Sequence, residues 1–178
     1  MKEKQAELID TLMSQLSEDE KTLCGAVIDY LLELGYMPKR HKKGTFVVAF
    51  EKKGRKIVKL EYGKHLKSDP TPFLTFWLRY SASDDLSPKF QEPIMKMSKA
   101  HEEKHGERMG EFGERYQHCG KCKDDPRLYT YVWPDGTKDS WCGGYTLMSF
   151  RNLTTEDVSE IFRHIKNQDE YYNNLLGV

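Results

Sequence analysis

The sequence has no long hydrophobic run and no excess of charge of either sign. Lysine plus arginine number 28, as do aspartate plus glutamate, so the formal net charge is zero. A chain without a basic excess lacks the attraction that draws proteins to nucleic acid or anionic membranes, and we expect neither partner. No stretch approaches the length of a transmembrane helix, and residues 1–7 are charged where a secretory signal would be apolar. We therefore expect a cytoplasmic protein.

Cysteine is also scarce, yet three of the four cysteines fall in one part of the chain. They form the pair Cys119 and Cys122, followed by Cys142. Two thiolates separated by two residues in a tight turn can reach one ion, and zinc prefers four sulfur or imidazole ligands in a tetrahedron. Gly120 can adopt the backbone angles that such a turn needs, and Lys121 favours ionised thiolates. The spacing predicts a structural zinc site.

The second half of this site is expected on a β-hairpin within residues 127–150. Its first strand would run over 128–133, and the turn Pro134-Asp135-Gly136 would lead into a second strand. The segment 139–143 then has the spacing and trailing glycine of a second cysteine knuckle, with Asp139 in place of the first cysteine. The span from Cys119 to Gly143 resembles a zinc ribbon. The resemblance implies Cys119, Cys122 and Cys142 as ligands, and Asp139 departs from its pattern.

The fourth metal ligand and the chemistry of the cysteines both have alternatives. Asp139 and His118 are about equal candidates for the fourth ligand, and His101 on the preceding helix competes with them. The cysteines could also be plain thiols, or Cys119 and Cys122 could form a disulfide or a thioredoxin-like redox site. A redox site of that kind follows a buried strand and opens a helix, which the polar residues around this pair do not favour.

Hydrophobic periodicity predicts one α+β domain over residues 1–178, with the zinc-ribbon-like hairpin at about 116–150. Apolar residues at helical spacing, with capping signals at Ser17, Pro88 and Thr154 and a stop at Gly35, predict four helices. Alternating apolar residues predict strands at 45–50, 57–62 and 73–81 in addition to the hairpin. We expect an antiparallel or mixed sheet of about five strands, covered by helices.

Residues 25–81 carry a further resemblance at the level of layout. A helix that ends in Leu34-Gly35-Tyr36 is followed by a lysine-rich meander of three predicted strands. This arrangement resembles small uncharacterised bacterial domains of the YdhG-like kind. The resemblance implies a compact α+β domain without an established activity, and it does not include the cysteine hairpin.

One segment suggests an enzyme. Residues 101–105, His-Glu-Glu-Lys-His, fit H-E-x-x-H, in which two histidines one helical turn apart bind zinc and the glutamate activates water. The segment resembles zincin metalloproteases, which implies His101 and His105 as ligands and Glu102 as general base. Zincins keep the two intervening residues uncharged, whereas this chain has a Glu-Lys pair there, and Gly106 follows where the helix should continue. A zinc-dependent hydrolase is therefore the alternative function, and we assign no catalytic residue.

Tryptophans supply the last hint of function. Trp77 alternates to the strand face opposite Leu74, Phe76 and Leu78, and Trp133 and Trp141 belong to the predicted hairpin. Large aromatic side chains with a polar edge line binding sites as well as cores. The three tryptophans can therefore be interpreted either as the lining of a binding pocket or as part of the core. We expect a domain that binds a small molecule or a protein partner and does not catalyse a reaction.

Overall fold

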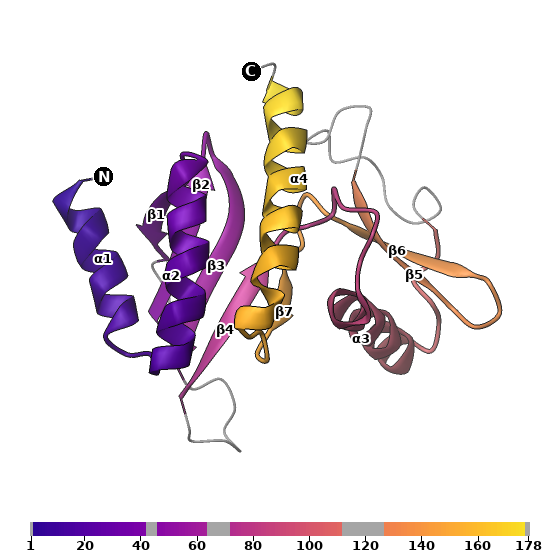
Figure 1. Ribbon diagram of the computed structural model, residues 1–178. Coiled ribbons are helices and arrows are strands. Elements are labelled where there is room, and N and C mark those ends of the chain that lie inside the picture. Colours follow the sequence, from indigo (N-terminus) through magenta and orange to yellow (C-terminus); the bar gives the residue numbers. More distant parts are fainter. Residues whose placement is uncertain (1, 42–45, 64–71, 112–126, 177–178) are drawn as a thin grey trace.

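The computed structural model describes residues 2–41, 46–63, 72–111 and 127–176, and its fold is α+β (Figure 1). This confirms the predicted fold class. A 3-10 turn, η1 (Thr155–Asp157), precedes the last helix. The other elements are, in chain order, α1 (Glu3–Met13), α2 (Glu18–Glu33), β1 (Met37–Arg40), β2 (Phe46–Lys52), β3 (Arg55–Gly63), β4 (Phe73–Leu78), α3 (Pro88–His105), β5 (Leu128–Val132), β6 (Lys138–Cys142), β7 (Met148–Phe150) and α4 (Val158–Leu176).

Five strands form one antiparallel sheet in the order β1-β2-β3-β4-β7, and β5 and β6 form a separate two-stranded hairpin. The sequence interpretation had counted the hairpin strands among the five. The edge strands β1 and β7, of four and three residues, take those places instead. In strands this short, too few apolar and polar residues alternate for the strand to be recognised from the sequence. Their pairing with longer strands in the structure identifies them.

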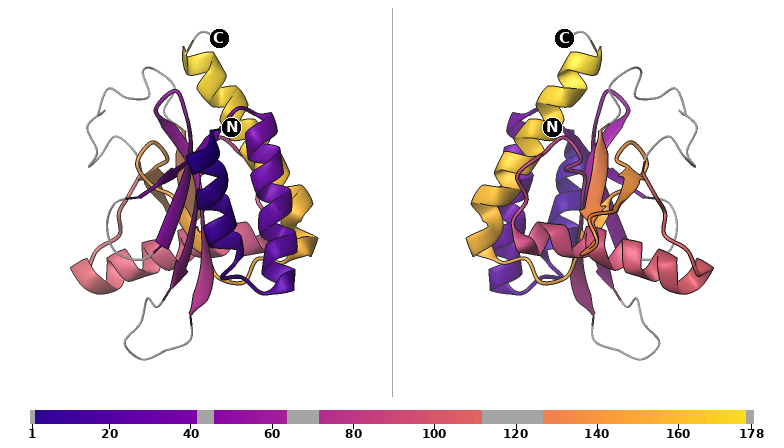
Figure 2. Two further views of the ribbon diagram at one scale, coloured as in Figure 1. Left: turned by 90° about the vertical axis from the view of Figure 1, so that its left-hand side faces the viewer. Right: turned by 90° about the vertical axis from the view of Figure 1, so that its right-hand side faces the viewer.

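Helices α1, α2 and α4 cover one face of the five-stranded sheet (Figures 1 and 2). The predicted alternation places the apolar residues of β3 and β4 under these helices, and none of them is more than 6% exposed. They are Val58, Leu60, Leu74, Phe76 and Leu78. On the opposite face, Lys59 and Trp77 are partly exposed. The sheet therefore has one core face and one face that is partly open to solvent.

Local signals set the helix ends as predicted. The Ser17 hydroxyl accepts the backbone N–H of Glu20, and Gly35 follows the helix with a φ of +83°. Ser87 precedes α3 with Pro88 at its first position, and the helix continues through Pro93. Among the helices of the described residues, none is long and apolar enough to cross a bilayer.

Tyr80 is fully buried just beyond the end of β4 and joins several elements. Its hydroxyl donates to the backbone carbonyl of Phe90 at 2.7 Å, and its backbone N–H donates to the Tyr129 hydroxyl at 3.0 Å. Its ring stacks on His164 of α4, with 5.3 Å between centroids, and lies 6.0 Å from Phe150 of β7. One side chain thereby holds α3, α4, β5 and β7 against the end of β4.

Two further contacts fix the hairpin. Trp141 donates its indole N–H to the Ser98 hydroxyl of α3 at 2.9 Å. Gly143 donates its N–H to the Arg127 carbonyl at 3.0 Å and lies so close to Ser81 that a Cβ atom at its position would overlap the Ser81 side chain. The glycine that the sequence suggested as part of a knuckle is thus required because the Ser81 side chain and the Arg127 carbonyl fill the space that a Cβ atom would need.

We predict that Tyr80→Phe lowers the free energy of unfolding by about 1–2 kcal/mol, because the ring contacts remain but the hydrogen bond from the Tyr80 hydroxyl to the Phe90 carbonyl is lost. Equilibrium unfolding in urea measures the change. Tyr145→Phe is the control, since Tyr145 is 58% exposed and water can replace any lost partner. An equal loss of stability in the two variants would contradict the role assigned to Tyr80.

Candidate functional site

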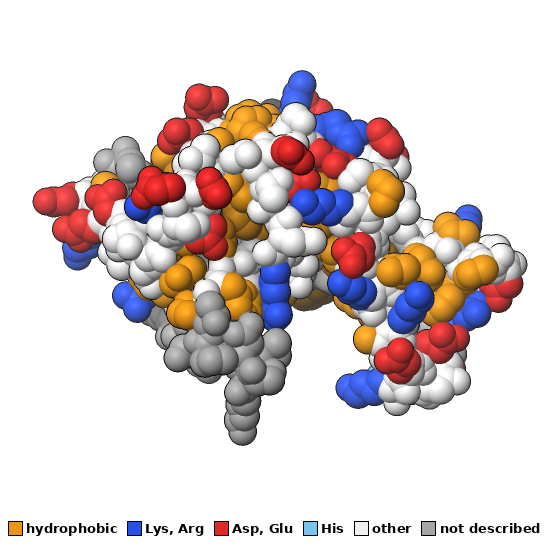
Figure 3. All heavy atoms as spheres, turned by 60° about the horizontal axis from the view of Figure 1, so that its bottom comes forward, with side chains coloured by type: hydrophobic (Ala, Val, Ile, Leu, Met, Phe, Trp, Pro, Cys, Tyr) orange, Lys and Arg blue, Asp and Glu red, His pale blue; other side chains and the backbone are white. Residues whose placement is uncertain are grey.

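A groove of about 550 Å³ lies between α3 and the edge of the sheet at β7. The helix contributes one wall, and Trp77 of β4 and the segment around β7 contribute the other. The lining residues are Trp77, Glu92, Pro93, Lys96, Met97 and 147–152. Figure 3 shows the molecule hollowed between the body that carries the sheet and the lobe on the right, which Figure 1 identifies as α3 and the hairpin. One of the three tryptophans predicted to bind a ligand therefore lies in this cavity.

Trp77 is held in position by its neighbours on the open face of the sheet. Its indole N–H donates to the Glu61 carboxylate at 2.8 Å, and the Lys59 ammonium lies 4.4 Å from the ring centroid. Burial lowers the pKa of Lys59, although Glu61 beside it favours the charged form. The register pairs Trp77 with Ser149 of β7, and a side chain as small as serine leaves the indole accessible across that strand. The groove thus has a large aromatic group fixed in advance of binding.

The β7 side of the groove is an open strand edge. β4 pairs with one side of β7, and no other strand of the described ranges pairs with the opposite side. Six consecutive residues, 147–152, line the groove, and three of them form β7 (Met148–Phe150), so the strand edge along the groove is roughly 10 Å long at 3.2–3.4 Å per residue. Along an edge strand, alternate residues direct their N–H and C=O groups outward. The groove offers backbone hydrogen-bonding groups as well as side chains.

Charged side chains lie at the rim of the groove. Lys96 and Glu92 form an ion pair one helical turn apart at 2.7 Å, with their side chains 68% and 41% exposed. Exposed Arg151 lies over the Phe73 ring, 4.4 Å from its centroid. Ion pairs as exposed as this contribute little to stability, so a partner can replace them at small cost. The rim can therefore take part in recognition.

Trp133 and Trp141 lie outside this groove and have structural contacts of their own. Trp133 is 7% exposed, and the Arg108 guanidinium lies 4.2 Å from its ring centroid. Trp141 bonds to Ser98, as described, and its ring meets that of His101 edge to face at 5.6 Å. The structure therefore does not bring the three tryptophans together, and the hairpin pair serves to pack β5 and β6 against α3 and the loop that follows it.

The predicted zinc ligands lie only partly within the described residues. Cys119, Cys122 and His118 fall outside them. Cys142 is the last residue of β6, is half-buried and is a free thiol. It pairs in register with Leu128, the first residue of β5. Within the ranges that the structure describes, no group of three or more His, Cys, Asp or Glu side chains is placed to hold a metal ion.

Asp139 does not accompany Cys142 as the knuckle interpretation required. It is fully buried, and its Oδ1 accepts the backbone N–H of Gly110 at 2.9 Å. Its Oδ2 is buried and has no hydrogen-bond partner in the part of the chain described. Because β6 is a regular strand, side chains three positions apart point to opposite faces, whereas a knuckle needs a tight turn. Of the two equal candidates for the fourth ligand, Asp139 therefore lies on the wrong face of β6 to join Cys142.

The His-Glu-Glu-Lys-His segment forms the last turn of α3, which ends at Gly106. Glu102, the general base on the zincin interpretation, accepts from Arg108 at 3.1 Å. Arg108 is in turn bonded to Asp135 at 2.6 Å. The carboxylate is therefore already occupied by an ion pair at the helix end, and this geometry does not support its use as a base.

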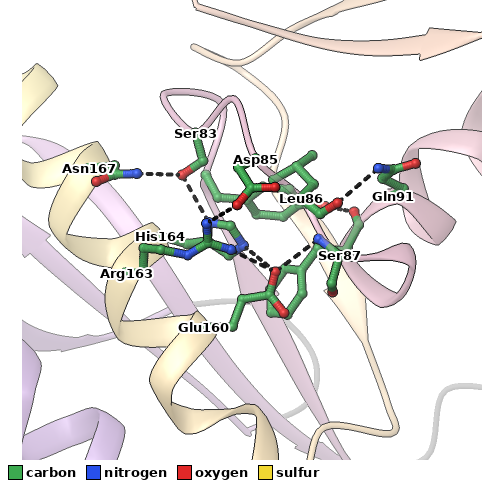
Figure 4. A network of polar contacts seen from close by, with 11 residues as sticks. Ser83, Asp85, Leu86, Ser87, Gln91, Glu160, Arg163, His164 and Asn167 are labelled. Atoms are coloured by element: carbon green, nitrogen blue, oxygen red, sulfur yellow. Dashed lines mark hydrogen bonds and ion pairs between the residues drawn. The ribbon is translucent and has the colours of Figure 1, made fainter.

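A buried polar network that sequence analysis missed connects α4 to the loop before α3 (Figure 4). His164 Nδ1 lies 2.9 Å from the Ser83 hydroxyl, and its Nε2 lies 3.3 Å from the Glu160 carboxylate. Glu160 also accepts the Ser87 backbone N–H at 3.0 Å and pairs with Arg163 at 3.1 Å. Only the one-turn spacing of Glu160 and His164 was visible in the sequence, because Ser83 is 81 residues away.

Serine, histidine and glutamate in this order resemble a hydrolase triad, but the chemistry does not suit catalysis. Burial lowers the pKa of His164 to about 4, although Glu160 favours its charged form, and a base this weak takes up few protons at neutral pH. The Glu160 carboxylate already accepts the Ser87 backbone N–H and pairs with Arg163, and Ser83 is itself buried. The network fixes the loop from Ser83 to Ser87 on α4.

We predict that His164 makes the fold acid-sensitive. Because its pKa is lowered to about 4 in the folded state, only the unfolded chain binds this proton as the pH falls below about 6.5. Stability should therefore be fully present above that pH and should decline by about 2 kcal/mol between pH 7 and 5 from this group alone. Urea unfolding at several pH values measures the decline. His164→Asn should reduce this pH-dependent decline in stability, and His41→Ala, at an exposed histidine, should leave the decline unchanged. The same decline in wild type and in His164→Asn would refute the assignment.

Comparison with known proteins does not assign this chain to a family. No protein-family model, no curated protein and no solved structure matches it. The resemblances to YdhG-like domains and to zinc ribbons thus stay predictions, and the geometry of the groove carries the functional conclusion.

Proposed function

We propose that this chain is a cytoplasmic binding domain that takes an extended segment of a partner protein into the groove between β7 and α3. The observation that carries the proposal is the row of six consecutive residues, 147–152, along the groove. A wall made by one unpaired strand edge favours an added strand, held by main-chain hydrogen bonds.

Side chains on both sides of the edge would give such a segment its specificity. In an added strand, alternate residues face opposite ways. One set would meet Pro93 and Met97 of α3, and the other would lie beside Ser149, within reach of Trp77. Tryptophan is enriched among the residues that dominate binding energy, and its fixed rotamer here reduces the entropy lost on binding.

The proposal is tested with peptides selected from a random phage-displayed library against the whole chain. We predict that Trp77→Ala and Ser149→Trp each weaken binding of a selected peptide by about tenfold or more, which corresponds to at least 1.4 kcal/mol. Trp77→Ala should lower the free energy of unfolding by less than the roughly 3–5 kcal/mol typical of a buried aromatic, because Trp77 is partly exposed. Titration calorimetry and urea unfolding give the two numbers.

Two controls separate strand addition from other modes of binding. Met37→Trp makes a comparable change on β1, the opposite edge strand, and should leave the affinity unchanged. N-methylation of single peptide bonds in the ligand should abolish binding only at every second position, because alternate N–H groups would face β7. Binding that tolerates every N-methyl group, or that is lost in Met37→Trp instead, would rule out the proposed site.

We further propose a structural zinc ion held by Cys119, Cys122 and Cys142, with His118 as the fourth ligand ahead of Asp139. Two features support it. The register places Cys142 opposite Leu128, at the end of the hairpin where the chain enters, and Cys122 precedes Leu128 by only six residues in the sequence. The thiol of Cys142 is also free and half-buried. A reducing cytoplasm would keep such thiols available for zinc.

Metal analysis of protein purified under reducing conditions tests this site. We predict about one zinc per chain, with loss of the metal in Cys119→Ser and in Cys142→Ser, since structural zinc requires its thiolates together. Cys24→Ser is the matched control. Cys24 is fully buried, and burial raises the pKa of its thiol to about 12, which makes it a poor ligand. Wild-type protein that is folded but contains no metal would contradict the zinc proposal. The same result would not affect the proposal that the groove binds an extended segment.

A further inference from the structure

The last turn of α3 carries two histidines on one side of the helix. His101 and His105 are one turn apart, and their ring centroids are 4.5 Å from each other with 32° between the planes. His105 is exposed and His101 is partly exposed, so ions in solution can reach the pair. We propose that the two imidazoles together bind a transition-metal cation of the borderline class, such as Ni²⁺, Cu²⁺ or Zn²⁺.

The position on the helix favours a cation. Residues four apart lie on the same face of an α-helix, which brings both imidazoles to one ion. The pair also stands at the carboxyl end of α3, which Gly106 terminates with a φ of +71°. Unsatisfied carbonyl groups give this end of a helix a partial negative charge. Imidazole nitrogens suit zinc, copper and nickel, and do not suit magnesium or calcium.

Among the described residues, the surrounding ion pairs leave the two histidines as the protein ligands of the site. Glu102 is paired with Arg108 at 3.1 Å, and Arg108 is also bonded to Asp135 and Thr137, both at 2.6 Å. These bonds engage the Glu102 carboxylate of α3 and the Arg108 guanidinium of the loop after it. Water would complete the coordination of the ion, which makes the site a binding site of moderate affinity without a general base.

Trp141 provides a direct readout. Its ring meets that of His101 edge to face, with 5.6 Å between centroids, and its indole N–H is bonded to Ser98 on the same helix. We expect a paramagnetic ion on the two imidazoles to quench the Trp141 indole, because that indole is in contact with the His101 ring. An ion bound there would also join α3 more firmly to the hairpin through the Trp141 contact.

The test is a titration of the whole chain with Ni²⁺, followed by tryptophan fluorescence and by calorimetry. One equivalent of Zn²⁺ is added first, so that the proposed cysteine site is filled. We expect saturable quenching that is reversed by excess Zn²⁺. His101→Ala and His105→Ala should each weaken Ni²⁺ binding by at least about tenfold, the lower end of the loss seen even for outer-shell partners. Trp141→Phe should remove most of the quenching while calorimetry still detects the ion.

Two controls decide where the ion binds. His41→Ala, at an exposed histidine remote in sequence, should leave Ni²⁺ binding unchanged, and so should Cys119→Ser when it is titrated without added zinc. Unaltered binding in His105→Ala, loss of binding in Cys119→Ser alone, or the absence of any quenching would each overturn the inference. Because His105 is exposed, its replacement should not affect folding, which a circular dichroism spectrum checks.

Discussion

Tyr80 occupies the point where the end of β4 meets α3, α4, β5 and β7, and the arrangement of the molecule depends on its burial. A tyrosine hydroxyl with no access to water must find a partner, and the Phe90 carbonyl supplies it at 2.7 Å. That bond fixes the first turns of α3 relative to the sheet. The width of the groove between α3 and β7 follows from it, because the same helix forms the opposite wall.

The second support of α3 is the network around His164. A neutral imidazole bonds to Ser83, and Glu160 accepts the backbone N–H of Ser87, the residue that precedes α3. Loop and helix are thus tied to α4 through a group whose pKa is lowered to about 4 by burial. The position of the groove wall is therefore coupled to the protonation of one buried side chain of α4, which does not itself line the groove.

The three tryptophans divide between support and recognition according to where they lie in the fold. The indole of Trp141 is bonded inside the molecule to Ser98, and Trp133 is buried under Arg108. Trp77 is fixed by Glu61 and Lys59 on the open face of the sheet and still lines a cavity. Residues of the same type therefore have different roles in this protein, and the role of each depends on where the fold places it.

By itself the sequence determined the local features: the α+β class, the cap at Ser17, the start of α3 at Pro88, the stop at Gly35, the hairpin turn and the buried face of β3 and β4. Each rests on residues close together in the chain. Only the tertiary structure decided the edge strands β1 and β7, the separation of the hairpin from the sheet, and the network of Ser83 with His164. It also placed Asp139 and Cys142 on opposite faces of β6, because a regular strand alternates where the spacing had suggested a turn. Contacts between residues 80 or more positions apart leave no periodic trace, so packing alone reveals them.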